Sequence, residues 1–431
     1  MNFYGTIKQT TFIECAILFM LFYTAPLFSY SPLRFSEVGA FMLIWLGLKK
    51  SVSISYRWPS LFYTLLAIWA LFDGIILSSH TFFQFSNHLT QGIRLLLGVS
   101  MFLLLPNVFK SLSVDEIIII LKRVLIINLW IQICYIFLYP ALGHYLFNII
   151  SSGDQRAALI AENAKFFNHF IIINTQRGYP QFSGIFDEPA WFGWNLNLII
   201  AILLQFEVSC GKRIFVRKDW IAIIVSYLST FSLSAIGGLL VIWVVYYLMA
   251  HKGGILKTVF FIVCILSIVL FFINLNPAIL SRLTMISQGG DGSATARFIG
   301  SWNALCTILS NNPITGYGLG DGNMASYFSE IHAKGNEAGI MVMGNVLLDI
   351  HIIIVQIVCN LGIIGAILYL APILSLIRKG SIIVCTGLIT VYFSVNVFNS
   401  FFLFFMTALA LYCFTAIYHP VKKSAGLIDG K

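Results

Sequence analysis

Long runs of apolar residues constrain this chain more than any other feature of its sequence. A helix that crosses a membrane needs roughly 20 apolar residues in a row, and about a dozen stretches approach that length. Hydrophobic residues make up 59% of the chain and charged residues only 10%. Soluble domains have about 45–50% and about 25%. We therefore expect an integral membrane protein, which excludes a soluble enzyme, a disordered scaffold and a secreted disulfide-bonded domain. The stretches lie near 12–29, 35–48, 60–78, 90–108, 117–139, 188–207, 219–233, 235–250, 257–275, 350–371, 381–397 and 399–418.

Basic residues give the expected orientation of these helices, because loops retained in the cytoplasm are enriched in Lys and Arg. With the N-terminus inside, 18 of the 26 Lys and Arg residues fall on the inner side and 8 on the outer side. The stretch 219–250 could be one long tilted helix or two short ones, and only two helices place Arg217, Lys218 and Lys252 all inside. We therefore predict an all-α polytopic membrane protein of about 12 transmembrane helices with both ends cytoplasmic. Residues 1–431 form a single integral membrane domain in this prediction.

Two long segments, 140–187 and 276–349, lie on the outer side in this topology, while every other connection is short. Long loops in a compact fold usually carry function. The net charge of +9 reflects this topology and not nucleic-acid binding, because no basic stripe alternates with aromatic residues on a soluble face. The basic residues of the two outer segments are Arg156, Lys165, Arg177, Arg282, Arg297 and Lys334.

Carboxylates are scarce in the predicted spans, where Glu14, Glu37 and Asp73 are the main candidates. An ionised side chain at the bilayer centre costs at least about 2.5 kcal/mol, so proton and ion pathways usually reveal themselves by such residues. The sequence therefore disfavours a pump or an ion-coupled transporter.

The first informative motif lies where the outer segment 140–187 meets the next span and reads GIFDEP over 184–189. Pro189 suits the first turn of a helix, and the helix dipole favours the carboxylates before it. Arg177 and Glu188 would then face the outer surface, with Arg177 as a phosphate ligand and Glu188 as a proton acceptor or an orienting partner. The alternative is an N-cap beside an arginine that reaches lipid headgroups.

The second informative segment runs from Arg282 through a glycine-rich turn to Trp302, and continues as NPITGYGLG over 312–320. Glycine-rich turns before an arginine-bearing amphipathic stretch predict a short helix at the membrane interface, with Arg297 pointing into a cleft. Arg282 is the weaker of the two cationic candidates. The glycines of 312–320 lack the spacing of a dinucleotide site, so we expect them to permit tight turns.

The third segment begins the span 350–371 and contains His351 and Gln356. A helix places these residues only approximately on one side, so Gln356 would line a cleft from one turn deeper. An imidazole titrates near neutral pH and can act as a base. The alternative is a helix-end histidine that binds backbone or lipid.

Taken together, these motifs resemble the bacterial O-antigen polymerase and O-antigen ligase superfamily. The resemblance rests on GIF-x-EP, an Arg followed by Trp, NP-x-x-G-x-G and H-x4-Q-x5-G-x-x-G, in that order, over about 177–193 and 282–365. It implies a polytopic glycosyltransferase of GT-C-like architecture in the bacterial inner membrane, with its active site facing the periplasm. By this resemblance Arg297 would hold the lipid diphosphate, His351 would lie near the transfer site, and Arg177 would match the polymerase arginine of the preceding loop.

Two positions depart from the family pattern. The family often has His-Asn where this chain has His351-Ile352, which bears on the orientation of the imidazole. It often has Ser-Arg in the central span where this chain has Ser234-Ala235, which removes one expected phosphate ligand and shifts that role to Arg177 or Arg282. The Phe-x-Glu-Pro sequence at 186–189 favours a polymerase over a ligase.

The chemistry implied is transfer of a glycan from a polyprenyl diphosphate. Arginine forks suit the departing diphosphate because they grip phosphate oxygens through paired hydrogen bonds. The sequence has no Asp-x-Asp pair for a divalent ion, so we predict a metal-independent and inverting transfer that uses no cofactor. Arg177 and Arg297 would bind the diphosphate, and His351 or Glu188 would assist the acceptor hydroxyl.

The partners implied are undecaprenyl-diphosphate-linked oligosaccharides as donor and acceptor, membrane lipids and a chain-length-regulating co-polymerase, with no nucleic acid. Three alternatives stay open. The chain could be an O-antigen ligase that transfers glycan to lipid A-core, a flippase or other transporter of lipid-linked oligosaccharides, or a noncatalytic assembly subunit. A transporter predicts internal repeats, broken helices near the midplane and short loops on both faces.

Overall fold

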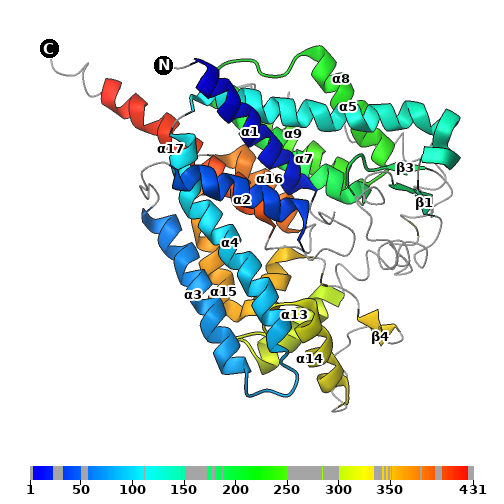
Figure 1. Cartoon of the computed structure of the whole chain (residues 1–431), viewed down its shortest axis with the longest axis vertical. Coiled ribbons are helices and arrows are strands. Elements are labelled where there is room, and N and C mark those ends of the chain that lie inside the picture. The colour runs from blue at the N-terminus through cyan, green and yellow to red at the C-terminus, as the bar shows by residue number, and fades with distance from the viewer. Residues whose placement is uncertain are drawn as a thin grey trace.

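Helices make up most of the computed structural model of the chain (Figure 1). The structure describes residues 3–22, 33–49, 57–110, 112–146, 148–150, 172–175, 180–186, 188–250, 284, 300–333, 342–343, 346–347, 350, 352–378, 381–393 and 400–425. The helices before the first outer segment are α1 (Phe3–Leu21), α2 (Phe35–Leu48), α3 (Arg57–Leu77), α4 (Phe85–Phe109) and α5 (Val114–Leu146). The later helices are α7 (Pro189–Cys210), α8 (Arg217–Thr230), α9 (Leu233–Ala250), α13 (Ser301–Asn311), α14 (Asp321–Ala333), α15 (Ile353–Arg378), α16 (Ile382–Tyr392) and α17 (Phe401–Ala425).

Several of these helices can cross a membrane. Among the described residues, six helices are long and apolar enough to span it, in α3, α4, α5, α7, α9 and α15. Shorter apolar helices of 10–17 residues occur in α1, α2, α16 and α17. The chain is therefore a multi-pass membrane protein, as the apolar stretches predicted.

The predicted stretches coincide at least in part with described helices, apart from 257–275, which lies outside the described residues. The question of 219–250 is settled in favour of two helices. α8 ends at Thr230, Phe231 takes a left-handed conformation with φ of 48°, and α9 begins at Leu233.

Helix α7 is the most deeply buried of the six spans, because it packs against α5, α8, α9, α16 and α17. Buried polar groups need hydrogen-bond partners, and Asn197 in α7 has two. Its side-chain nitrogen donates to the carbonyl of Ala235 at 3.2 Å, and its oxygen accepts from the hydroxyl of Tyr227 at 2.8 Å. This network joins α7 to both α8 and α9.

A cluster of aromatic rings joins α3, α4, α15 and α17. The ring of Tyr63 lies edge-on to the rings of Phe102 and Phe404, with centroids 4.4 and 5.4 Å apart. Aromatic pairs prefer this edge-to-face geometry. Gly98 permits the close approach of α4 to α17, because a Cβ there would lie 2.6 Å from the ring of Phe404.

Ion pairs gather at the end of the bundle that is predicted to face the cytoplasm. They connect α5 to α1, to α8 and to the α7–α8 connection. The pairs are Lys122–Asp219 at 2.7 Å, Lys212–Asp115 at 3.0 Å and Arg123–Glu14 at 3.1 Å.

The outer segments contain short strands, which the all-α prediction did not anticipate. In the first, β1 (Asn148–Ile150), β2 (Ile172–Asn174) and β3 (Gln181–Phe182) form a sheet in the order β1-β2-β3. β1 and β2 are parallel, whereas β2 and β3 are antiparallel. In the second, β4 (Val342–Met343) pairs with β5 (Val346–Leu347).

The span predicted at 117–139 is longer in the structure, where α5 continues to Leu146 with Pro140 inside the helix. Membrane helices tolerate such prolines.

A second hydrophobic core lies under α13 and α14, which belong to the described part of the segment 276–349, beside the lower ends of α3 and α4 in Figure 1. In this segment α13 begins at Ser301 with Gly300 as its N-cap, whereas Arg297, which the predicted short helix carried, lies outside the described residues. We call this cluster the outer core. It consists of Leu77, Phe82, Ala304, Ile308, Tyr317, Met324, Tyr327, Phe328, Ile331, Ile350, Ile352, Val355 and Cys359.

Candidate functional site

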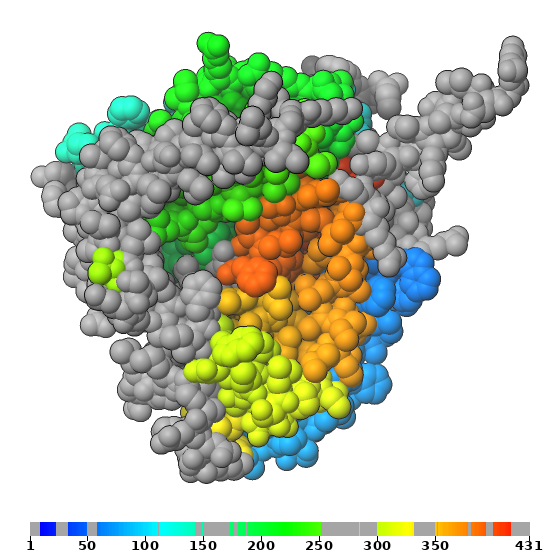
Figure 2. Space-filling model, turned by 180° about the vertical axis from the view of Figure 1, so that it is seen from behind, coloured from blue at the N-terminus to red at the C-terminus, as the bar shows by residue number. Residues whose placement is uncertain are grey.

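The predicted site residues divide between described and undescribed parts of the chain. Glu188 and Gln356 are described, whereas Arg177, Arg282, Arg297 and His351 lie outside the described residues. Glu188 precedes α7 and Gln356 lies near the start of α15. α16 contacts both α7 and α15. Figure 2, the view from behind, shows the orange surface of α15 and α16 between the green surface of the preceding spans and the yellow-green surface of α13 and α14.

Glu188 is the N-cap residue of α7. Its backbone is extended, with φ of −132° and ψ of 143°, and Pro189 follows in the first turn, as the sequence predicted. Its carbonyl accepts a hydrogen bond from the backbone N–H of Phe192 at 3.3 Å. The side chain makes no capping hydrogen bond, and the residue is half-buried.

The backbone just before Glu188 is docked onto the outer ends of α5 and α8. Gln132 of α5 donates to the carbonyl of Phe182 and to the hydroxyl of Ser229, both at 2.9 Å. Gln181 donates to the carbonyl of Thr230 at 3.2 Å. Residues 181–186 are buried, so the motif at 184–189 is attached to a packed base and not to an open loop.

The loop 312–320 has the tight turns that its glycines predicted. Gly316, Gly318 and Gly320 have φ of 69°, 87° and 105°, which residues with a side chain rarely adopt. Gly316, Tyr317, Gly318, Leu319 and Gly320 are all buried. The loop is therefore a packed structural element between the outer core and the membrane helices.

The loop docks onto a break in α15 at Gly362. This residue has φ of 67° and ψ of −171°, which no helical residue has. A Cβ at Gly362 would overlap the carbonyl of Ile314, so the close approach requires glycine. The sequence did not predict this break, because the apolar stretch continues through it. The glycine in H-x4-Q-x5-G is the signal that could have found it.

Hydrogen bonds from the loop satisfy the backbone groups that the break would leave unpaired. The N–H groups of Tyr317 and Gly318 donate to the carbonyls of Cys359 and Asn360 at 2.8 and 3.1 Å. Trp69 of α3 donates from its indole nitrogen to the carbonyl of Leu361 at 2.9 Å. The break is thus filled by protein, with each bond replacing one that a continuous helix would make.

Asn360 and His88 anchor the same loop from two sides, and the sequence predicted neither role. Asn360 accepts from the N–H of Gly320 at 3.2 Å and donates to the hydroxyl of Tyr317 at 3.3 Å. Nδ1 of His88 accepts from the N–H of Leu319 at 3.0 Å, and Nε2 lies 2.8 Å from the carbonyl of Ala70. Because Nδ1 accepts, the proton is on Nε2, and His88 is a neutral structural histidine.

Gln356 and Tyr327 are buried polar groups near this loop. The side-chain oxygen of Gln356 is buried and has no hydrogen-bond partner among the described residues. The hydroxyl of Tyr327 in the outer core likewise has no partner there. Burial raises the pKa of Tyr327 to about 12, so this side chain keeps its proton and remains a donor. Buried groups of this kind can bind a substrate or a water molecule.

The three carboxylates expected in or near the spans have different environments. Glu14 pairs with Arg123. Glu37 pairs with Arg94 at 2.9 Å and also accepts from the N–H of Arg34 at 3.0 Å. Arg94 lies inside a predicted span, and the sequence analysis assigned it no role. The carboxylate of Asp73 is fully buried and has no hydrogen-bond partner among the described residues.

The structure accounts for the absence of the central arginine. Ala235 is fully buried against Gly193, where α9 contacts α7. A Cβ at Gly193 would overlap the Cβ of Ala235. An arginine at position 235 would therefore have no room without separating the two helices.

Comparison with known proteins identifies one family. A search of curated proteins finds no match. A family model described as O-antigen ligase matches residues 220–370, from α8 to the middle of α15. This range includes Arg282, Arg297, His351 and Gln356, together with the loop 312–320 and the break that it fills. This part of the chain is therefore similar to the O-antigen ligase family.

Proposed function

We propose that this protein is a glycosyltransferase of the bacterial inner membrane, and specifically an O-antigen polymerase. It transfers the growing glycan from polyprenyl diphosphate onto a lipid-linked repeat unit at the periplasmic face. The observation that carries the proposal is the 220–370 match over a segment whose NP-x-x-G-x-G loop is bonded into α15. The Phe-x-Glu-Pro sequence at the start of α7 favours a polymerase over a ligase within the family.

In the proposed reaction, a hydroxyl oxygen of the acceptor repeat unit attacks the anomeric carbon of the donor glycan. The bond from that carbon to the diphosphate oxygen breaks, and its electron pair leaves with the polyprenyl diphosphate. The hydroxyl proton passes to His351 or Glu188. Direct attack inverts the anomeric configuration, and the products are a lengthened lipid-linked glycan and free polyprenyl diphosphate.

The proposed role of Arg177 and Arg297 is to bind the diphosphate as its negative charge increases. Planar guanidinium groups suit this task because they form paired hydrogen bonds to phosphate oxygens. Arg282 supplies a further cation in this proposal, and the buried oxygen of Gln356 is an acceptor for a sugar hydroxyl. The donor and acceptor are both lipid-linked, so the reaction belongs where the outer loops meet the bilayer.

Two alternatives can be weighed against specific observations. The matching family model is described as O-antigen ligase, which supports transfer to lipid A-core. The broken α15 is a feature of many transporters. In transporters, however, such breaks line a cavity, whereas the carbonyls at this one are bonded to a buried loop and to Trp69. The break therefore gives transport little support.

One reconstitution separates these functions. The purified protein is incubated with lipid-linked repeat units and no other enzyme, once alone and once with lipid A-core. A ladder of longer lipid-linked glycans without lipid A-core supports a polymerase. Glycan found on lipid A-core and nowhere else identifies a ligase. Unchanged substrate across several lipids and pH values contradicts transferase activity and favours transport.

A further inference from the structure

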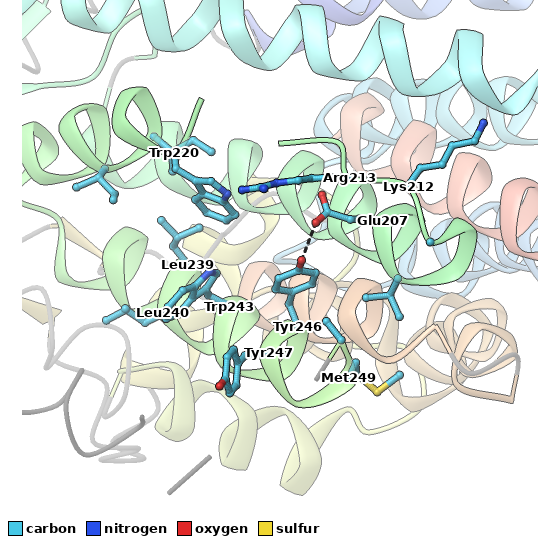
Figure 3. Close-up of a pocket in the computed structure, with 15 residues that line it drawn as sticks. Glu207, Lys212, Arg213, Trp220, Leu239, Leu240, Trp243, Tyr246, Tyr247 and Met249 are labelled. Carbon is cyan, nitrogen blue, oxygen red and sulfur yellow. Dashed lines mark hydrogen bonds between the residues drawn. The ribbon is translucent and has the colours of Figure 1, made fainter. Parts of the chain in front are cut away.

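A cavity of about 1170 Å³ lies between the end of α7, the α7–α8 connection, α8 and α9 (Figure 3). It is at the end of these helices opposite to Glu188 and the start of α9. Most of its wall is apolar or aromatic, and its rim is charged. The wall includes Trp220, Leu239, Leu240, Trp243, Tyr247 and Met249.

Glu207 lies on the rim of this cavity and joins the elements that form it. One of its carboxylate oxygens accepts from the backbone N–H groups of Ile214 and Phe215 at 2.8 and 3.3 Å. The other accepts from the hydroxyl of Tyr246 at 2.7 Å, drawn as the dashed line in Figure 3. Glu207 therefore holds α9 and the α7–α8 connection to α7. These three donors partly offset the negative charge of Glu207, so it repels an anion less than a carboxylate without hydrogen bonds would.

The α7–α8 connection and the first turn of α8 are strongly basic, with the sequence KRIFVRK over 212–218. Figure 3 shows the side chain of Arg213 extended along the rim toward Trp220. Its Nε donates to the carbonyl of Phe215 at 3.1 Å, and its terminal nitrogens have no partner among the described residues. Lys212 also lines the cavity, but its ammonium group is turned to Asp115 and binds it at 3.0 and 3.2 Å. Hydrogen bonding to that carboxylate raises the pKa of Lys212.

We propose that this cavity binds one anionic phospholipid, with the headgroup phosphate on Arg213 and an acyl chain along the wall formed by Trp220, Leu240 and Trp243. Basic pockets between helices on the cytoplasmic side of a membrane are suited to anionic headgroups. Tryptophan and tyrosine are favoured at the level of the headgroups, where the ring is apolar and its edge is polar. The assignment rests on the proposed orientation, in which the α7–α8 connection faces the cytoplasm, and not on the proposed reaction.

A lipid in this cavity would have a structural role, because α9 is the least buried of the candidate spans among the described residues. Only 17% of its spanning window is buried, against 78% for α7. A lipid in the cavity would bury part of the exposed face of α9 and hold it against α8. By fixing α9, the lipid would also support the contact of α9 with α7, where Ala235 meets Gly193.

Native mass spectrometry of the full-length protein in detergent tests the proposal by titration with phosphatidylglycerol or with zwitterionic phosphatidylethanolamine. The wild type should hold one phosphatidylglycerol in preference to phosphatidylethanolamine. Arg213→Gln should weaken phosphatidylglycerol binding by about fivefold, the worth of about one cation near an anionic headgroup. The matched control is Lys110→Gln, which removes an exposed cation at the end of α4 and away from the cavity. Equal binding of the two lipids contradicts the proposal, as does an equal effect of the two variants.

Photo-crosslinking of the wild type gives a second test that needs no variant. A phosphatidylglycerol with a diazirine in its acyl chain should label peptides within residues 220–247. Labelling confined to other parts of the chain means that the cavity is filled by something else, such as another segment of this protein or a second copy. Neither measurement depends on turnover, so an inactive protein that passes both tests refutes the proposed function and leaves this site standing.

Discussion

Gly362 and His88 show what a single residue contributes to this protein. A partial signal for the role of Gly362 was present in the sequence, because this glycine belongs to a spaced motif. The glycines of 312–320 make the turns that were predicted. The roles of His88 and Asn360 could not be predicted from the sequence, because their partners in the loop lie 231 and 40 residues away along the chain. Sequence spacing identifies local backbone requirements, whereas distant hydrogen bonds depend on the whole arrangement of helices.

Replacing Gly362 with alanine should destabilise the protein by at least about 2 kcal/mol. Its φ and ψ lie in a region that is essentially reserved for glycine, and strain there costs about 1–3 kcal/mol. The added Cβ would also overlap the carbonyl of Ile314. The measurement is the fraction of monodisperse protein that survives a temperature series in detergent, read by size-exclusion chromatography.

The control for this variant is Gly237→Ala in α9, where a Cβ would meet nothing within 4 Å. Alanine is the better helix former by about 1 kcal/mol, so this control should be neutral or stabilising. If both variants survive heating equally, the tight contact between Ile314 and α15 is not a real constraint.

Among the helices and loops, apolar runs predicted where the described spans lie, but not how they pair. The chain continues as apolar sequence through the break in α15, so hydropathy gave no sign of it. The strands β1 and β2 are parallel and come from positions more than 20 residues apart, which no local pattern reveals. Glu37 was recognised as a carboxylate near the membrane, but its partner Arg94 on α4 depended on which helix faces meet.

The docking of the loop 312–320 onto α15 predicts the effect of Asn360→Ala. The change removes the acceptor for the N–H of Gly320 and the donor to Tyr317, both of which are buried. Leaving such groups unpaired costs about 1–3 kcal/mol, and the loop should open more often. Limited proteolysis followed by mass spectrometry should show faster cleavage within 312–320 than in the wild type.

Asn311→Ala is the matched control, because its side-chain nitrogen donates to the carbonyl of Thr307 within α13 and not to any described residue of α15. Its cleavage rate should equal that of the wild type. Unchanged proteolysis of the Asn360→Ala protein would mean that this asparagine does not secure the loop.

At the scale of the whole molecule, the two ends of the helices carry different groups of residues. The ion pairs of α5 and the basic α7–α8 connection lie at one end of their helices, and the strand β3, Glu188 and the end of α8 lie at the other. The positive-inside rule assigns the first end to the cytoplasm. The arginines predicted to bind the diphosphate would then share the periplasmic side.

This orientation predicts the labelling of two cysteines that are exposed in the structure. Cys210 ends α7 and Cys306 lies in α13. The variants retain either Cys210 or Cys306 and lack every other cysteine. A membrane-impermeant maleimide should label Cys306 in intact spheroplasts. It should label Cys210 only after the membrane is permeabilised. The opposite pattern would invert the topology and would place the family motifs on the cytoplasmic side.

The central claim is that Arg177 and Arg297 together stabilise a departing diphosphate, and the rate of chain extension by purified variants measures it most directly. Arg177→Ala and Arg297→Ala should each lower that rate by about 10²–10³, by analogy with the loss of one preorganised donor to a developing negative charge. Lys165→Ala in the same outer segment as Arg177 is the control and should retain the wild-type rate. If Arg297→Ala yields glycan of normal length and amount at a normal protein level, the diphosphate is not bound in the proposed way.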